Sequence, residues 1–135
     1  MKVRRLKREY RKSASTGHKA LGDLLRNSKI FGGYKIYQEY PVKRINPNHK
    51  SGKHKFDWVI LDLKVVIEVH GKQHYGPVNF GGRPPSESEA MFEKQVSVDK
   101  IKMQAAKEAG FNYLAIPDSS ISDLTDNDLC AMLGI

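Results

Sequence analysis

The chain has 135 residues and a formal net charge of +8, so we expect one domain that is large enough to bury its own core. Its single cysteine, Cys130, excludes an internal disulfide and a cysteine-rich zinc site. No apolar run approaches the roughly 20 residues that a membrane span needs, so we expect a cytoplasmic protein with neither a signal peptide nor a membrane anchor.

Basic residues crowd the first twelve positions, which hold seven Lys or Arg against one acid, Glu9. We interpret residues 1–14 as a basic N-terminal arm, either mobile or a marginal helix, followed by one domain over residues 15–135. A cluster of this kind favours a polyanionic partner, and we prefer nucleic acid to anionic lipid or nuclear import. The arm residues expected to contact phosphate are Arg4, Arg5, Lys7 and Arg8.

The first helix is expected to begin at residue 15 or 16, where a hydroxyl side chain can cap it, and to end near residue 27. His18 and Asp23 lie off the apolar stripe of this helix. A strand is expected near residues 34–40, and Pro41 ends it or marks a sheet edge.

Residues 45–55 predict a turn-rich basic loop. Because the loop directly precedes the next strand, its lysines can reach a nucleic-acid backbone lying over that strand, and such contacts position a substrate without reading its sequence. His49 and His54 are an alternative pair of zinc ligands, although no cysteine accompanies them. The loop residues expected to contact phosphate are Lys50, Lys53 and Lys55.

Two apolar, β-branched runs on either side of Asp62 predict a β-hairpin over residues 56–70. If the turn is centred just after Asp62, one face is wholly apolar, and the other carries Asp57 directly opposite Glu68, with His70 on the side of Glu68. The pairs expected on the apolar face are Phe56 with Val69, Trp58 with Ile67 and Ile60 with Val65, and Val59 is expected opposite Val66 on the other face.

The expected Asp57–Glu68 pair needs a compensating charge. Two carboxylates about 5 Å apart repel by about 3 kcal/mol at an effective dielectric constant near 20. A divalent cation, a shared proton or a nearby cationic side chain would offset this repulsion. Since the two acids lie among Val and Ile, with histidines close behind, we interpret them as a candidate metal site rather than as a solvated strand face.

The rest of the chain predicts a long loop, a helix, a strand and a short helix. The Gly/Pro-rich residues 71–85 form the loop, the long helix runs from Ser86 or Ser88 to Gly110, and a buried strand at 111–116 is stopped by Pro117. Thr125 and Asp128 form a capping box for a last helix that ends at Gly134. The core candidates of the long helix are Phe92, Val96, Ile101, Ala105 and Ala109. This order of elements predicts an α/β fold with a mixed central sheet flanked by helices.

The order helix, three strands, helix, strand, with Asp57 on the second strand and Glu68-Val69-His70 on the third, resembles the PD-(D/E)xK, or restriction-endonuclease-like, superfamily. The string from Glu68 to Tyr75, with Phe56-Asp57 before it and Asp99 after it, is most similar to the branch of very-short-patch-repair endonucleases and phage homing nucleases. The resemblance covers roughly residues 15–117 and implies an αβββαβ core.

The resemblance also implies a role for the residues that match the motif. Asp57 and Glu68 would ligate Mg²⁺, with Mn²⁺ as the alternative ion, and the carbonyl of Val69 would be a further ligand. His70 takes the position of the superfamily lysine, and Asp99 is similar to the late acid of the branch. Because the superfamily lysine is missing, Lys72 or a histidine would stabilise the negative charge at the site instead.

Two further roles in the site fall to histidines. His74 is similar to the histidine that acts on water in the repair endonucleases, so either His74 or His70 is the general base and the other contacts the phosphate. His18 stands where the first helix usually presents an acid. Three alternatives follow. The helix contributes a different ligand, Asp23 substitutes for the missing acid, or the helix lies outside the metal site.

These roles predict a Mg²⁺-dependent DNA endonuclease that leaves 5′-phosphate and 3′-hydroxyl ends on double-stranded or branched DNA. The resemblance implies a bacterial or phage-infected host cell and a task in repair, recombination or homing. One alternative is a Holliday-junction resolvase of the same fold, which would work as a symmetric homodimer. The other is a catalytically weak nucleic-acid-binding module, which the histidine at position 18 favours.

Overall fold

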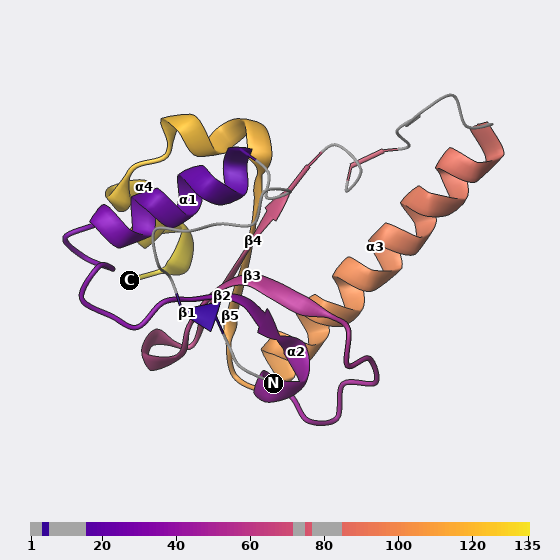
Figure 1. Ribbon diagram of the computed structural model, residues 1–135, viewed down its shortest axis with the longest axis horizontal. Coiled ribbons are helices and arrows are strands. Elements are labelled where there is room, and N and C mark those ends of the chain that lie inside the picture. The colour runs from indigo at the N-terminus through magenta and orange to yellow at the C-terminus, as the bar shows by residue number, and fades with distance from the viewer. Residues whose placement is uncertain (1–3, 6–15, 72–74, 77–84) are drawn as a thin grey trace.

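The computed structural model describes residues 4–5, 16–71, 75–76 and 85–135, which form a mixed β-sheet with helices on both faces (Figure 1). Strands β1 to β4 pair in antiparallel fashion, whereas β5 lies parallel to β4, and helix α3 makes the crossover that a parallel neighbour requires. The predicted α/β fold with a mixed sheet flanked by helices is confirmed. In their order across the sheet the strands are β1 (Arg4–Arg5), β2 (Tyr37–Pro41), β3 (Lys55–Ile60), β4 (Val65–His70) and β5 (Asn112–Pro117).

Helices cover the sheet from both sides. The helices are α1 (Thr16–Asn27), α2 (Val42–Ile45), α3 (Pro85–Glu108) and α4 (Asp126–Leu133), and the short 3₁₀ turns are η1 (Leu61–Leu63) and η3 (Asp118–Asp123). The boundaries predicted for α1 and α4 are confirmed. At α4 the capping box is complete, because Asp128 N–H donates to Thr125 Oγ1 at 3.1 Å and Thr125 N–H donates to Asp128 Oδ2 at 3.0 Å.

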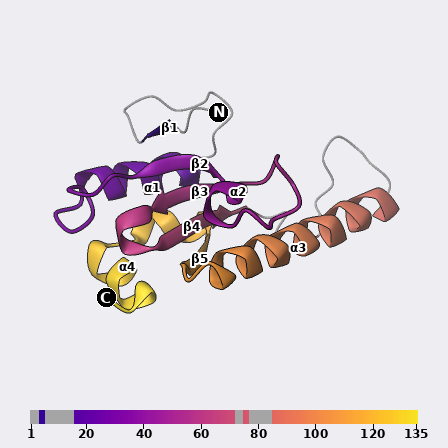
Figure 2. The same cartoon turned by 90° about the horizontal axis from the view of Figure 1, so that it is seen from below.

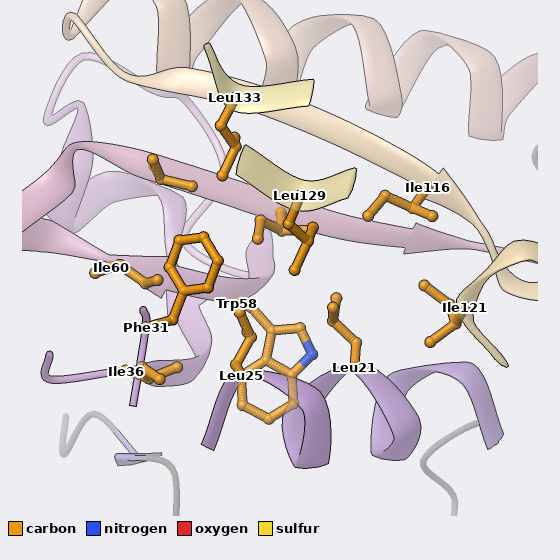
Figure 3. Packing of buried hydrophobic residues seen from close by; sticks show 12 residues of the cluster. Leu21, Leu25, Phe31, Ile36, Trp58, Ile60, Ile116, Ile121, Leu129 and Leu133 are labelled. Atoms are coloured by element: carbon orange, nitrogen blue, oxygen red, sulfur yellow. The ribbon is translucent and has the colours of Figure 1, made fainter. Parts of the chain in front are cut away.

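Each face of the sheet packs into its own apolar cluster. On one face Trp58 lies against Leu21 and Leu25 of α1, and residues of α4 complete the cluster (Figure 3). On the other face Val59 and Val66 pack with α2 and with the C-terminal half of α3. Both faces of the hairpin are therefore buried, because α2 and α3 cover the second face.

The hairpin has the predicted register over its central three pairs, which are Trp58 with Ile67, Val59 with Val66 and Ile60 with Val65. The ladder ends there, so Asp57 and Glu68 are not a ladder pair, contrary to our prediction. Instead the Val69 N–H donates to Asp57 Oδ2 at 2.8 Å. Phe56 also departs from the prediction, because it packs in the cluster beneath α3 and not beside Trp58. An acid side chain that accepts a backbone N–H of the partner strand thus replaces the expected pairing at this end.

Helix α3 extends well beyond the rest of the molecule at its N-terminal end (Figures 1 and 2). It is anchored near its C-terminus by the buried Ala105 and Ala106. Two of its predicted core residues are exposed instead, Val96 by 44% and Ile101 by 49%. A helix that projects past the sheet has no partner for these side chains within the described parts of the chain, which explains the error.

Three other elements differ from the expectation. Strand β2 begins at Tyr37 rather than near residue 34, and the four-residue helix α2, which was not predicted, lies between β2 and the predicted loop and shares only Ile45 with it. Strand β5 is shifted by one residue, includes Pro117, and is only partly buried. These shifts occur at element ends, where local sequence preferences are weakest.

The basic arm is described only at Arg4 and Arg5, whose backbone pairs with β2 as the short strand β1. This part of the arm is therefore a strand and not a helix. Lys7 and Arg8 lie outside the described residues, and the domain boundary at residue 14 stays a prediction. In the described parts of the chain, no helix combines the length and the apolar character that crossing a membrane requires.

Candidate functional site

The site is centred on Glu68, a buried acid near the end of β4 that is 3% exposed. Lys102 Nζ, from α3, lies 2.6 Å from Glu68 Oε1. The Tyr113 hydroxyl, from β5, donates to the same oxygen at 3.3 Å. Three elements that are separate in sequence, the strand β4, the crossover helix and the parallel strand β5, therefore meet at one carboxylate.

The position of Glu68 alters its acidity. Burial raises the pKa of Glu68 from 4.5 to about 7, the Lys102 ammonium opposes that rise, and the charge of Asp57 adds to it. Burial also raises the pKa of Tyr113, so its hydroxyl stays a donor at neutral pH. Of the three ways to offset repulsion between the acids, the described residues supply the nearby cationic side chain, Lys102.

Asp57 lies beside Glu68 but has its own partners. Its Oδ2 accepts the Val69 N–H, and its Oδ1 is 3.9 Å from His18 Nδ1. The two carboxylates still interact, because the Asp57 charge contributes to the raised pKa of Glu68. This pair is therefore a concentration of negative charge that Lys102 balances in part.

His18 comes from the first turn of α1 and is 4% exposed. Its ring packs on the Trp58 ring with centroids 4.7 Å apart, and its Nε2 is 3.5 Å from Gln38 Oε1. The prediction that His18 lies off the buried face of α1 is wrong, because this end of the helix also rests on the sheet. Asp23 does not replace it, since the Asp23 side chain is exposed and accepts a hydrogen bond from Arg26 at 3.2 Å.

His70 lies on the same side of β4 as Glu68, as the alternation of side chains predicts. It is 8% exposed, and its Nε2 is 4.0 Å from Asp99 Oδ1 on α3. The Asp99 carboxylate also accepts a hydrogen bond from Gln95 Nε2 at 2.8 Å. The two predicted residues are thus brought together, whereas His74 and Lys72 lie outside the described residues.

Asp57 and Glu68 fit a hard divalent cation. No group of three or more His, Cys, Asp and Glu side chains suited to a metal ion occurs among the residues that the structure describes. Mg²⁺ does not require such a group, because one or two carboxylates usually hold it while water and substrate phosphates fill its other positions. The two acids form a donor set of this kind, and the Val69 carbonyl stays a predicted third ligand.

The lysines of the loop before β3 lie on the surface of the protein. Lys50, Lys53 and Lys55 are all exposed, and Lys55 is the first residue of β3, two positions before Asp57. The expectation that they bind DNA stays a prediction. The side chains of Arg4 and Arg5 are not described.

No protein-family model, curated protein or solved structure matches this chain. The role of the site is therefore inferred from its own residues. The site consists of the buried Glu68 and the half-buried Asp57 on two neighbouring strands. Lys102 of α3 contacts Glu68, and His70 of β4 lies beside Asp99 of α3.

Lys102 and Tyr113 are the two residues of the site that the sequence did not single out. Lys102 follows Asp99 by three positions, so both lie on one face of α3, and assigning Asp99 to the site could have led to Lys102. Tyr113 offered no such signal. Its place beside Glu68 depends on the register of β5 against β4, in which Ala115 pairs with Glu68.

Proposed function

We propose that this protein is a Mg²⁺-dependent DNA endonuclease with a restriction-endonuclease-like core of the PD-(D/E)xK type. The observation that carries the proposal is the contact between Lys102 and Glu68 beside Asp57. It gives the site two acids and a lysine, the set that the superfamily motif supplies from two strands. The element order, helix, three strands, helix and strand, supports the same proposal.

The chemistry follows from the position of each group. A Mg²⁺ ion held by Asp57 and Glu68 would lower the pKa of its bound water and neutralise charge on the phosphate. Lys102 would stabilise the negative charge that develops on the phosphate oxygens. His70 would accept a proton, and the Asp99 carboxylate at 4.0 Å would stabilise the imidazolium that forms. His74 remains the second candidate for the general base.

A second candidate function has an observation of its own. His18 packs on Trp58 at the place where an acid was expected, so one metal ligand of the family pattern is replaced by a side chain that is used in packing. This favours a nucleic-acid-binding module with weak catalysis or none. Double-stranded or branched DNA is the proposed partner of either form, and a homodimer is its proposed state on symmetric branched DNA.

Cleavage of supercoiled plasmid with Mg²⁺ or Mn²⁺ tests the proposal. We expect Glu68→Gln and Lys102→Met each to lower the cleavage rate by about 100-fold or more, since each removes a charged group from the site. The matched controls are Asp62→Asn, an exposed acid at the other end of the same hairpin, and Lys100→Ala, an exposed lysine of α3. Both controls should cleave at the parent rate.

The enzyme proposal fails if the parent leaves every DNA intact, or if Glu68→Gln cleaves as fast as the parent. The substrates should include duplex, nicked, mismatched, four-way branched and single-stranded DNA. Selective cleavage of the four-way branch by a dimer would identify a resolvase, and binding to DNA without cleavage would identify a binding module.

A further inference from the structure

A second concave site lies between the basic loop and the C-terminal half of α3. It is a cavity of about 360 Å³. Its walls combine two imidazole rings, three amides and the Glu108 carboxylate with the apolar side chains of Ile101 and Ala105. This mixture is typical of a small-molecule pocket, in which apolar surface provides contact and a few polar groups fix the orientation of the ligand.

The two histidines form one wall of the cavity. His49 Nε2 and His54 Nδ1 are hydrogen-bonded at 2.8 Å, and the ring centroids are 4.9 Å apart. Burial lowers the pKa of both histidines, and the nearby charge of Lys102 lowers each further. His49 is buried, whereas His54 is partly exposed and offers an aromatic plane on which a flat ligand can stack.

The loop that forms the cavity is fixed to α3 by Asn46. Its Nδ2 donates to the Ala105 carbonyl at 3.1 Å and to Glu108 Oε2 at 3.3 Å. Its Oδ1 accepts the Asn48 N–H at 3.1 Å. Because all these contacts lie within the protein, the cavity is formed before any ligand enters.

The side chains of Asn48 and Gln104 also line the cavity, and both are exposed. An amide presents one acceptor and one donor group side by side, and this pair matches the edge of a nucleobase. Lys50 lines the same cavity, and its ammonium suits the phosphate that such a base carries.

The cavity lies close to the candidate catalytic site. Ile101, Gln104 and Ala105 lie within one turn of Lys102 on α3, and each helical residue advances the chain by about 1.5 Å. Lys102 contacts Glu68 and is also near enough to lower the pKa of both cavity histidines. A nucleic acid held at Glu68 therefore passes near the mouth of the cavity.

We propose that this cavity binds one unpaired nucleobase of a DNA whose backbone lies across the site at Glu68. Its volume is at the lower end of the roughly 300–1,000 Å³ found for ligand pockets, which suits one base and excludes a duplex. The base stacks on His54, and Asn48 and Gln104 bind its edge. The identity of the ligand rests on the proposed function, since DNA is its source. The protein would thereby select DNA that contains an unpaired base.

Binding of three labelled duplexes in EDTA tests this proposal. One duplex is fully paired, one has a single unpaired adenine, and one has an unpaired abasic nucleotide at the same place. Since base stacking on an aromatic side chain contributes about 1 kcal/mol or more, we expect the adenine bulge to bind about 5-fold tighter, or more, than the other two. The abasic bulge keeps the bend and the extra phosphate, so it separates binding of the base from binding of the distorted backbone.

The double variant Asn48→Ala with Gln104→Ala should lose most of this preference while it binds the paired duplex as the parent does. Both side chains are exposed, so the variant should unfold in urea at the parent midpoint. The matched control is Asn127→Ala, an exposed amide of α4 that is remote in sequence from the cavity, and it should keep the preference. His54→Phe, which retains an aromatic plane, should keep part of it.

Equal affinity of the parent for the adenine and abasic bulges would overturn the proposal, as would a preference that survives in the double variant. Failure to bind any of the three duplexes would overturn it as well. Because no Mg²⁺ is present, cleavage does not enter the measurement. A preference for the adenine bulge in a protein that never cleaves plasmid would refute the nuclease and leave the base-binding cavity intact.

Discussion

Replacing Glu68 with glutamine should remove a large part of the pH dependence of the stability of this protein. In the native state the buried carboxyl has a pKa of about 7, against 4.5 as its ordinary value. Between these two pH values the native state binds a proton that the unfolded chain has lost. Stability therefore falls as the pH rises from about 4.5 to about 7, and the stabilisation by the protonated Glu68 is fully present only below that window.

The size of the effect follows from the shift. A difference of one pKa unit corresponds to 1.36 kcal/mol, so a rise from 4.5 to about 7 corresponds to about 3 kcal/mol in the free energy of unfolding. Glutamine is neutral at every pH and lacks this dependence. It also leaves Lys102 without its partner, so the prediction concerns the change of stability with pH and not its absolute value.

Urea unfolding at half-unit steps from pH 4.5 to pH 8, in EDTA, measures the prediction. The free energy of unfolding of Glu68→Gln minus that of the parent should rise by about 3 kcal/mol across this range. Asp62→Asn, which alters an exposed acid of the same hairpin, should show a flat difference over pH 5 to pH 8. A flat difference for Glu68→Gln as well would refute the raised pKa, and with it the reading of Glu68 as a buried acid that Lys102 only partly compensates.

Three further outcomes are expected. Lys102→Met removes the charge that opposes the rise in the Glu68 pKa, so in the same urea series the loss of stability should move to higher pH; an unchanged window would contradict the contact. Gly17→Ala should lower the free energy of unfolding by about 1–3 kcal/mol, because its Cβ would collide with the Asp118 carboxylate that accepts the Gly17 N–H, whereas Gly33→Ala, with open space around it, should stay within about 0.5 kcal/mol of the parent. Thr125→Ala should lower the free energy of unfolding by about 1 kcal/mol, because it breaks the capping box. If this loss is no larger than the loss caused by replacing an exposed serine with alanine, the cap contributes nothing.

Much of the fold could be predicted because local patterns and global packing agree. The alternation around Asp62 predicted the central register of the hairpin, the apolar stripe predicted α1, and the capping box at Thr125 predicted the start of α4. The errors have a common physical origin in contacts between distant parts of the chain. A period-3.6 pattern marks Val96 and Ile101 as apolar positions of α3, but it cannot tell how far the helix extends past the sheet.

The candidate site shows the same division. Asp57, Glu68, His70 and Asp99 could be proposed from their order and spacing, and His70 and Asp99 do meet. The prediction that Asp57 and Glu68 lie directly opposite each other was wrong. The Asp57 side chain instead accepts a hydrogen bond from the backbone N–H of Val69 on β4. Whether any of the four acts on DNA stays a prediction, and so does the metal.

The contact between Lys102 and Glu68 has a consequence for searches with linear sequence motifs. A linear motif that demands lysine two places after the acid would pass over this chain, since His70 stands there, although an ammonium group touches the acid from the next helix. Electrostatic work at a phosphate depends on the separation of atoms in space and not on their separation along the chain. A buried acid on a strand can therefore receive its balancing ammonium group from a helix that is distant in sequence.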